Sequence, residues 1–191
     1  MSGKKVLIVN AHQVPSSLDG SLKSVAEDEL SRQGCMVTVS DLYTMDFEPR
    51  ATGEDIWGVC SNLKCFSYGI EAYETCKKRS LARDIMDEQK KVQEADLVIF
   101  QGKLAVSLTR GDQVWNDMKD SVNADSQAYL WPLPHGVLYL CGFKVLAPQI
   151  SSAPNFTSEE EKNGMVASWA QRLKTIWTEE PIKPRCTLKL L

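Results

Sequence analysis

The chain has 191 residues, of which 43% are hydrophobic and 25% are charged, and its formal net charge is -3. These proportions are typical of a globular protein, and we expect one domain over residues 1–191 with a C-terminal tail at 181–191. Acidic and basic residues alternate, which argues against a nucleic-acid partner, because such a partner requires a clustered basic face. No segment approaches the ~20 apolar residues of a membrane span, and the N-terminal apolar run is too short for a signal peptide, so we expect a cytoplasmic protein.

The first 45 residues predict a strand, a helix and a second strand. Residues Lys5–Ala11 form a continuous apolar run, which is typical of a parallel strand buried on both faces. A loop with Pro15 follows, and Gly34 marks the end of the predicted helix. The apolar positions that define the helix are Leu22, Val25, Ala26 and Leu30, and those of the next strand are Val37, Val39 and Leu42. This order indicates a βαβ unit.

The rest of the chain continues the alternation of helices and strands. Residues 45–70 are expected to be irregular, 73–94 mostly helical, and 95–100 a third strand. A further strand is expected around Val137–Leu140 or Phe143–Leu146. The last helix begins at a capping box, Ser158 with Glu161, and Pro181 stops it. Its apolar face consists of Met165, Val166, Trp169, Leu173, Ile176 and Trp177. The pattern predicts an α/β fold with a doubly wound parallel sheet.

One spacing conflicts with that pattern. Lys103–Leu108 has the character of a fourth strand, yet only Gln101 and Gly102 separate it from the third. Neighbouring parallel strands require a crossover of at least a dozen or so residues. The two runs therefore form one long strand, or an antiparallel hairpin, or one of them leaves the sheet. Each option breaks the doubly wound pattern of the rest of the chain, so the spacing alone is a reason to infer a missing segment here.

The loop after the first strand is the first candidate site. In an open α/β sheet, ligands bind at the carboxyl ends of the strands, and a helix N-terminus there favours a phosphate. His12, Ser17 and Ser21 offer additional donors, whereas the Asp19 carboxylate would repel a phosphate. The alternative interpretation is that Asp19 or Ser21 simply caps the helix. Neither GxGxxG nor a Walker motif is present in the sequence.

Two further groups have weaker claims to a site. His135 and Cys186 are possible metal ligands, but a structural zinc site requires four. By itself His135 is better read as a hydrogen-bonded histidine near a strand start. Thr109, Arg110, Gly111 and Asp112 form a polar segment after a strand-like run, for which an ordinary turn is the stronger interpretation.

Several stretches resemble the quinone reductases of the NAD(P)H dehydrogenase (quinone) family, in particular the ribosyldihydronicotinamide-dependent type. The matching stretches are Lys4–Val9, Ala11–Pro15, Val39–Tyr43, Phe47–Thr52, Arg79–Ala82, Asp87–Val92, Ala95–Gln101, Gly102–Ala105, Leu130–Gly136, Cys141–Ser151 and the final helix. The resemblance implies a flavodoxin-like fold and a homodimer. It also implies FAD, which passes a hydride from a dihydronicotinamide donor to a quinone. The family has about 40 more residues between Gln101 and Gly102, including the crossover between the third and fourth strands that the spacing rule requires.

The resemblance assigns roles residue by residue, and several positions differ from the family. The implied flavin contacts are His12, Ser17, Leu18, Asp19, Gly20, Ser21, Thr109, Arg110, Gly111, Asp112, Asn155 and Lys162. Asp19 replaces an Asn, Asn155 a Glu and Lys162 an Arg, and two of the four residues from Thr109 to Asp112 differ. Asn123 matches an active-site Asn, while Asp117 stands near the active-site Tyr. For zinc, His135 and Cys186 match but Tyr139 replaces a His, so we expect weak or no zinc binding.

Two functions follow from these observations. The first is an FAD-dependent, two-electron quinone reductase. The second is a catalytically impaired or inactive remnant, a splice product or diverged duplicate that acts, if at all, as a binding or dimerisation partner. The missing segment and the substitutions predict that FAD binding is weakened or lost, so activity of this chain is an open question at this point.

Overall fold

The computed structural model describes residues 3–56, 67–102, 137–138, 141–149 and 158–182. It divides the chain into two compact units, Met1–Lys103 and Leu104–Leu191. Each unit is described by itself. The expectation of a single domain stays a prediction.

The first unit is built on a three-stranded parallel sheet. Its strands are β1 (Lys5–Asn10), β2 (Met36–Asp41) and β3 (Leu97–Gln101), in the order β2-β1-β3. β1 pairs on one side with β2, from Lys5 opposite Met36, and on the other with β3, up to Asn10 opposite Gln101. Val6, Leu7 and Ile8 are almost fully buried, because the central strand is covered on both faces. The three predicted strands are thereby confirmed, with Leu42 just beyond the end of β2.

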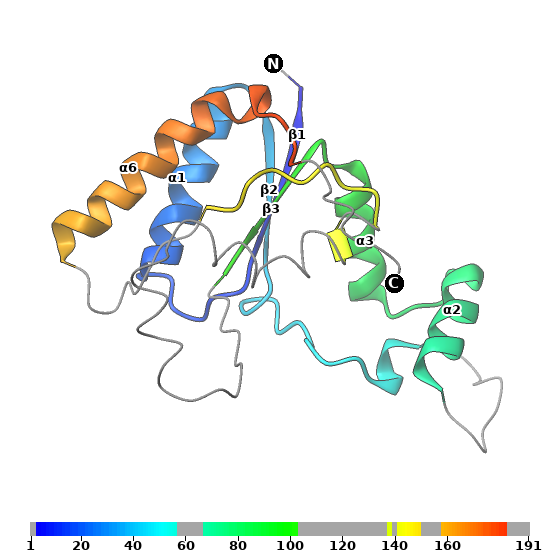
Figure 1. Ribbon diagram of the computed structural model, residues 1–191. Helices are drawn as coiled ribbons and strands as arrows, with labels where there is room; N and C mark the ends of the chain where they lie inside the picture. Colours follow the sequence, from blue (N-terminus) through cyan, green and yellow to red (C-terminus); the bar gives the residue numbers. More distant parts are fainter. Residues whose placement is uncertain (1–2, 57–66, 103–136, 139–140, 150–157, 183–191) are drawn as a thin grey trace, which may run out of the picture. The chain divides into compact units, whose positions relative to one another are not determined.

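Helix α1 (Leu18–Arg32) makes the crossover from β1 to β2. It buries Ala26 and Leu30 and packs against both of these strands. Gly34, with φ of 81°, stands directly after the C-cap residue Gln33 and provides the left-handed turn that ends the helix, as predicted. Figure 1 places α1 and α3 on opposite sides of the sheet, which is the doubly wound arrangement.

The segment between β2 and β3 contains two α-helices where one was predicted. A short 3-10 helix η1 (Gly53–Asp55) is followed by α2 (Tyr68–Lys78) and α3 (Arg83–Glu94). The predicted helix over 73–94 is interrupted because Arg79 takes a left-handed conformation, with φ of 53°, and caps α2. Leu81 then pairs with Ile56 in an isolated antiparallel bridge and is buried there, so it does not belong to the helical stripe.

The described part of the second unit centres on α6 (Glu159–Thr175), which continues into the 3-10 helix η4 (Ile176–Thr178). Ser158 and Glu161 form the predicted capping box, and the apolar face carries the buried residues Trp169, Leu173 and Ile176. None of the helices in the described ranges has the length and apolar character that crossing a membrane requires.

The strand predicted around 137–146 is not found in the described residues of that stretch. Val137 and Leu138 lie in a π-helical turn, and residues 143–149 have no regular secondary structure. Single contacts take up two carbonyl groups of this segment instead. The Ile182 N–H donates to the Val145 carbonyl at 2.9 Å, and Arg172 Nη2 donates to the Ala147 carbonyl at 2.6 Å. An apolar run fits an extended chain whether or not a neighbouring strand pairs with it.

Candidate functional site

The candidate site lies where β1 and β3 end. The chain passes from β1 to β2 on one side and returns to β3 on the other, so the strand order reverses at β1. Open α/β sheets bind ligands outside the carboxyl ends of the strands at such a switch point. The loop of residues 11–17 occupies this position and leads into the N-terminus of α1. The Ala11 N–H donates to the Gln101 carbonyl at 3.1 Å and ties the start of the loop to β3.

His12 organises the loop through both of its ring nitrogens. The Val14 N–H donates to Nδ1 at 3.1 Å, and the Ser17 hydroxyl lies 3.1 Å from the same nitrogen. Nδ1 also lies 3.2 Å from the Val14 carbonyl, so it accepts from the Val14 N–H in one tautomer and donates to this carbonyl in the other. Nε2 faces the Asp19 carboxylate at 3.6 Å, and both side chains are about four-fifths buried. The carboxylate therefore stands beside the second ring nitrogen of His12.

Ser17 is the N-cap of α1, which corrects the alternative interpretation that Asp19 or Ser21 has this role. The Ser17 side chain accepts from the Gly20 N–H at 3.3 Å. The Ser21 hydroxyl donates back to the Ser17 carbonyl at 3.3 Å. Asp19 stands in the first turn instead, where a negative charge is stabilised by the positive end of the helix dipole. The loop residues predicted as flavin contacts are thus held together around the first turn of α1.

Gly20 is required by a close backbone approach. An added Cβ would meet the carbonyl group of Pro15, 2.7 Å from its carbon and closer still to its oxygen. The loop therefore lies directly on the first turn of α1, and only glycine leaves room for it.

Two carboxamide side chains complete this end of the sheet, and sequence reasoning did not single them out. Asn10 is 2% exposed and, as the last residue of β1, stands opposite Gln101 of β3. Asn10 Nδ2 donates to the Asp41 carboxylate at 3.2 Å, and Gln101 Nε2 donates to the Asp19 carbonyl. In the described part of the chain, however, neither Asn10 Oδ1 nor Gln101 Oε1 receives a hydrogen bond. Polar residues at the ends of two apolar strands were the signal in the sequence.

Asp41, at the end of β2, anchors α1 beside these amides. Lys23 Nζ donates to Asp41 Oδ2 at 3.0 Å, and the Thr44 N–H donates to Oδ1 at 3.2 Å. Burial raises the pKa of the Asp41 carboxyl, but the hydrogen bonds from Lys23, Thr44 and Asn10 outweigh burial, so the pKa falls below its usual value. The cluster fixes α1 to the carboxyl edge of the sheet.

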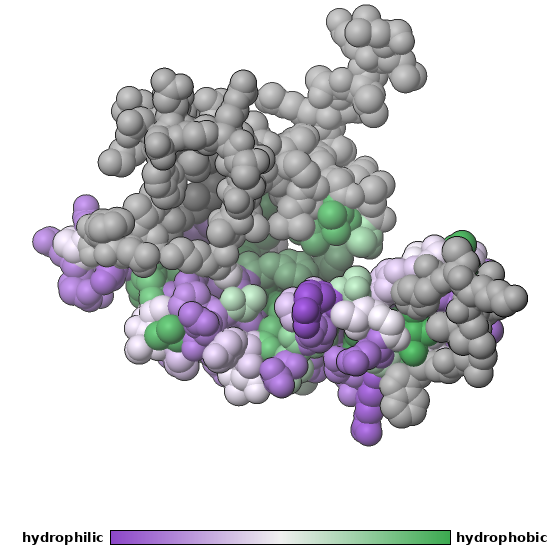
Figure 2. Space-filling view, turned by 90° about the horizontal axis from the view of Figure 1, so that it is seen from below, coloured by the Kyte–Doolittle hydropathy of each residue, from purple (hydrophilic) through white to green (hydrophobic). Residues whose placement is uncertain are grey.

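The surface around this edge combines polar and apolar side chains. Figure 2, which views the molecule from below, shows hydrophilic residues over much of the described surface, with hydrophobic residues between them. Val14, Tyr43 and Met45, from the loops that follow β1 and β2, are among the exposed large hydrophobic residues. Such a surface offers both charged groups and apolar contact area to a ligand.

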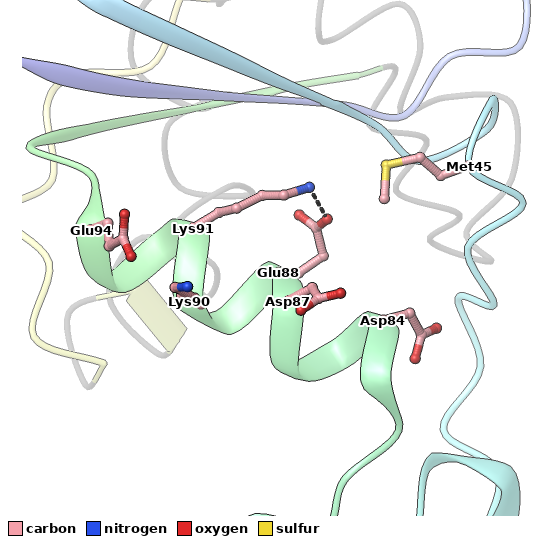
Figure 3. Close-up of a pocket in the computed structure, with 7 residues that line it drawn as sticks. All are labelled: Met45, Asp84, Asp87, Glu88, Lys90, Lys91 and Glu94. Carbon is pink, nitrogen blue, oxygen red and sulfur yellow. Dashed lines mark hydrogen bonds and ion pairs between the residues drawn. The ribbon is translucent and has the colours of Figure 1, made fainter.

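A separate groove of about 440 Å³ runs along α3 (Figure 3). Met45 and six charged residues of α3 line it: Asp84, Asp87, Glu88, Lys90, Lys91 and Glu94. Lys91 pairs with Glu88, and both also bond the fully buried Ser40 hydroxyl, at 3.1 and 2.7 Å. These contacts connect α3 to β2, so they have a structural role, and the acidic excess of the groove does not favour an anionic ligand.

The other predicted site residues belong to the second unit or lie outside the described residues. Lys162 lies on α6 in the second unit, where its ammonium pairs with Glu159 at 2.6 Å. The remaining ones lie outside the described residues: Asn123, Thr109, Arg110, Gly111, Asp112, Asn155, His135 and Cys186. Within the described ranges, no group of three or more His, Cys, Asp and Glu is placed to hold a metal ion. The zinc prediction rests on residues beyond those ranges and stays a prediction.

The parallel sheet in the order β2-β1-β3, with helices on both faces and a ligand loop at the switch point, defines the flavodoxin-like class. Residues 4–102 match the family model described as a flavodoxin-like fold. The crystal structure of a Klebsiella pneumoniae protein aligns with a TM-score of 0.80 at 24% identity, over 94% of this chain and 87% of that one. The chain therefore has the flavodoxin-like fold.

Curated relatives narrow the class further. The chain is 55% identical to ribosyldihydronicotinamide dehydrogenase [quinone] of Homo sapiens over 95% of this chain and 96% of the relative. It is 53% identical to the Mus musculus protein of the same name, over 98% and 97%. The chain belongs to the ribosyldihydronicotinamide dehydrogenase (quinone) family. The human alignment runs over 221 positions, whereas 95% of 191 residues is about 181, so some 40 positions of the relative lie opposite gaps in this chain.

Proposed function

We propose that this chain is an FAD-dependent quinone reductase that transfers a hydride from a dihydronicotinamide donor, of the dihydronicotinamide riboside type, to quinones. The observation that carries the proposal is membership of a family whose human and mouse members are named for this activity, at 55% and 53% identity over nearly the whole chain. The fold supports it independently, because flavodoxin-like sheets bind a flavin at the β1/β3 switch point.

The described residues fit the proposed cofactor. A diphosphate group needs hydrogen-bond donors and a positive potential, which the N-terminus of α1 supplies. The His12 ring adds a donor beside it. The oxygens of Asn10 and Gln101 are hydrogen-bond acceptors without a partner, and a ligand with hydroxyl groups would donate to them. Bound FAD would supply two-electron chemistry, accepting a hydride from the donor and passing it to the quinone.

The protein's part in this reaction is to bind and orient. The loop from His12 to Gly20 would hold the diphosphate, with Ser17 fixing the loop to the first turn of α1. The exposed side chains of Val14, Tyr43 and Met45 offer apolar contact to planar groups. The Asp19 carboxylate opposes the phosphate charge, so we expect FAD to bind more weakly than it would with a neutral residue there. The roles of Asn123, Thr109–Asp112, Asn155 and Lys162 remain proposals from the resemblance.

The location of the gap, the assembly and the compartment complete the proposal. We place the 40-position gap between Gln101 and Gly102, where the spacing of the strands requires a crossover. A homodimer is expected, with no nucleic-acid partner. A cytoplasmic location fits the free thiols of Cys35, Cys76 and Cys141, since that compartment keeps thiols reduced. No contact among the described residues favours the alternative of an inactive remnant.

The test is to incubate the purified chain with FAD, remove free ligand, and measure bound flavin by absorbance. Menadione reduction is then followed with dihydronicotinamide riboside and, separately, with NADH. We expect a yellow protein and turnover that is faster with dihydronicotinamide riboside. A colourless protein without turnover would refute the proposal.

A matched pair of cap variants locates the cofactor. Ser17 caps α1 at the proposed site, and Ser158 caps α6 in the second unit. Ser17→Ala and Ser158→Ala should each lower the free energy of unfolding by about 1 kcal/mol. Only Ser17→Ala should also weaken FAD binding. Equal FAD affinity in the two variants would place the cofactor elsewhere.

A further inference from the structure

The unpaired oxygens of Asn10 and Gln101 are not accounted for by the packing of the sheet. Buried polar atoms nearly always have a hydrogen-bond partner, and an unsatisfied one is destabilising. Here two such atoms occur on register partners, at the ends of neighbouring strands. Side chains at paired positions of adjacent strands share a face of the sheet. The two side chains therefore lie at adjacent positions on one face of the sheet, where one ligand can serve both oxygens.

The orientation of both amides is fixed by their nitrogen atoms. Asn10 Nδ2 donates to the Asp41 carboxylate, so turning this amide over would place an oxygen against an anion. Gln101 Nε2 donates to the Asp19 carbonyl, and the reversed amide would set two acceptors against each other there. The oxygens consequently remain the free ends, and each needs a donor.

The donor must come from a ligand with hydroxyl or N–H groups. Gln101 lies against the first turn of α1 through its bond to Asp19, directly beside the proposed diphosphate position. An ionised phosphate has no proton to donate, whereas the middle carbons of the ribityl chain carry hydroxyl groups, each of which is a donor. We propose that Asn10 and Gln101 form the acceptor half of the flavin site and receive hydrogen bonds from the hydroxyl groups of the ribityl chain. This inference rests on the proposed function.

Both oxygens are buried in this structure. The loop 11–17 follows β1 directly; its residues from Gln13 to Ser16 are exposed, and it contains no helix or strand. Segments with few buried apolar contacts open locally at low free energy, so we expect the ligand to reach the two oxygens by a shift of this loop. Binding would then give each oxygen a hydrogen-bond donor.

Three flavins and three variants test this inference. Riboflavin carries the ribityl chain without phosphate, lumiflavin has a methyl group in its place, and FAD is the complete cofactor. Gln101→Met and Asn10→Leu keep the side-chain size and remove the acceptor. Ser40→Ala is the control, because Ser40 is a fully buried residue of β2 whose hydroxyl bonds to Glu88 and Lys91 of α3. Affinities are measured by quenching of flavin fluorescence, and thermal unfolding of the flavin-free chain confirms that each variant folds.

The expected result is a three- to tenfold loss of riboflavin and FAD affinity in Gln101→Met and in Asn10→Leu, with lumiflavin affinity unchanged within twofold. Ser40→Ala should leave all three affinities unchanged. If the wild-type chain binds FAD but Gln101→Met and Asn10→Leu keep its ratio of riboflavin to lumiflavin affinity, this inference is wrong while the proposed function stands. A wild-type chain that binds none of the three overturns both. Should one variant fail to fold, the other decides.

Discussion

Replacing Gly20 by alanine tests the structure of the ligand loop directly. The added Cβ would lie 2.7 Å from the Pro15 carbonyl carbon, whereas carbon atoms in contact stay about 3.5–4.0 Å apart. The backbone at Pro15 must therefore move by about 1 Å or more, and overpacking of this kind costs about 1–3 kcal/mol. Alanine also improves helix propensity by about 1 kcal/mol relative to glycine. The clash involves backbone rather than a flexible side chain, so we expect a cost in the upper part of that range, about 2–3 kcal/mol, and a net loss of stability of about 1–2 kcal/mol.

Gly164, a glycine within α6, is the matched control. A Cβ there meets no atom within 4 Å, so Gly164→Ala should stabilise the chain by about 0.5–1 kcal/mol. Both variants are unfolded in urea and followed by circular dichroism, and FAD affinity is measured in parallel. Gly20→Ala should also weaken FAD binding, because the displaced loop no longer fits the first turn of α1. Stabilisation of similar size in both variants would show that Pro15 does not lie on Gly20, and the geometry of the loop would be wrong.

Three other substitutions probe the charges of the two units. Asp19→Asn removes a carboxylate from the proposed diphosphate position, so FAD affinity at low salt should rise at least fivefold. The reason is that like charges about 4 Å apart repel by about 1 kcal/mol even in water. Riboflavin, which has no phosphate, should bind with unchanged affinity. Asp41→Asn should lower the free energy of unfolding by about 1–3 kcal/mol at pH 7. The folded-state pKa of Asp41 lies below its unfolded value, so its contribution is complete above about pH 4 and is lost as the pH falls through the folded value. The difference between Asp41→Asn and wild type should accordingly shrink in urea unfolding at pH 3, and a constant difference would contradict the assignment. Arg172→Lys keeps the charge but loses the planar group that joins Glu179 to the Ala147 carbonyl. Amide hydrogen exchange in residues 143–149 should therefore become faster. An unchanged exchange rate would show that Arg172 does not hold this segment in place.

Periodicity in the sequence was sufficient to predict the sheet and the two long helices. β1 is a continuous apolar run because it is covered on both faces, and α6 begins where its capping box stands. Both signals are local and need no knowledge of distant contacts. The break between α2 and α3 had no such signal, because Arg79 takes a left-handed conformation that glycine or asparagine usually marks.

The candidate site was only partly predictable for a related reason. The loop from His12 to Ser21 was found because a strand end followed by a helix start is a local pattern. Its internal arrangement was not, since Ser16, Ser17, Asp19 and Ser21 are all competent caps in the sequence. Ser17 is identified as the cap only in the structure, by the hydrogen bond that its side chain accepts from the Gly20 N–H. Asn10 and Gln101 are 91 positions apart, so their pairing follows from the sheet register and from no local signal.

The burial of β3 connects the gap in the chain to its proposed function. Leu97, Val98 and Ile99 are only half-buried and Phe100 is 53% exposed, although β3 is as apolar as the buried strand β1. A parallel strand with apolar side chains on both faces is suited to cover on both faces. The crossover that we place between Gln101 and Gly102 would supply part of that cover in the longer relatives. The loop that holds the proposed cofactor precedes the gap, while the cover of β3 follows it. We therefore expect the gap, at the place we propose, to act first on the stability of β3 and then on FAD binding through Gln101, the residue where β3 ends and to which the ligand loop is tied.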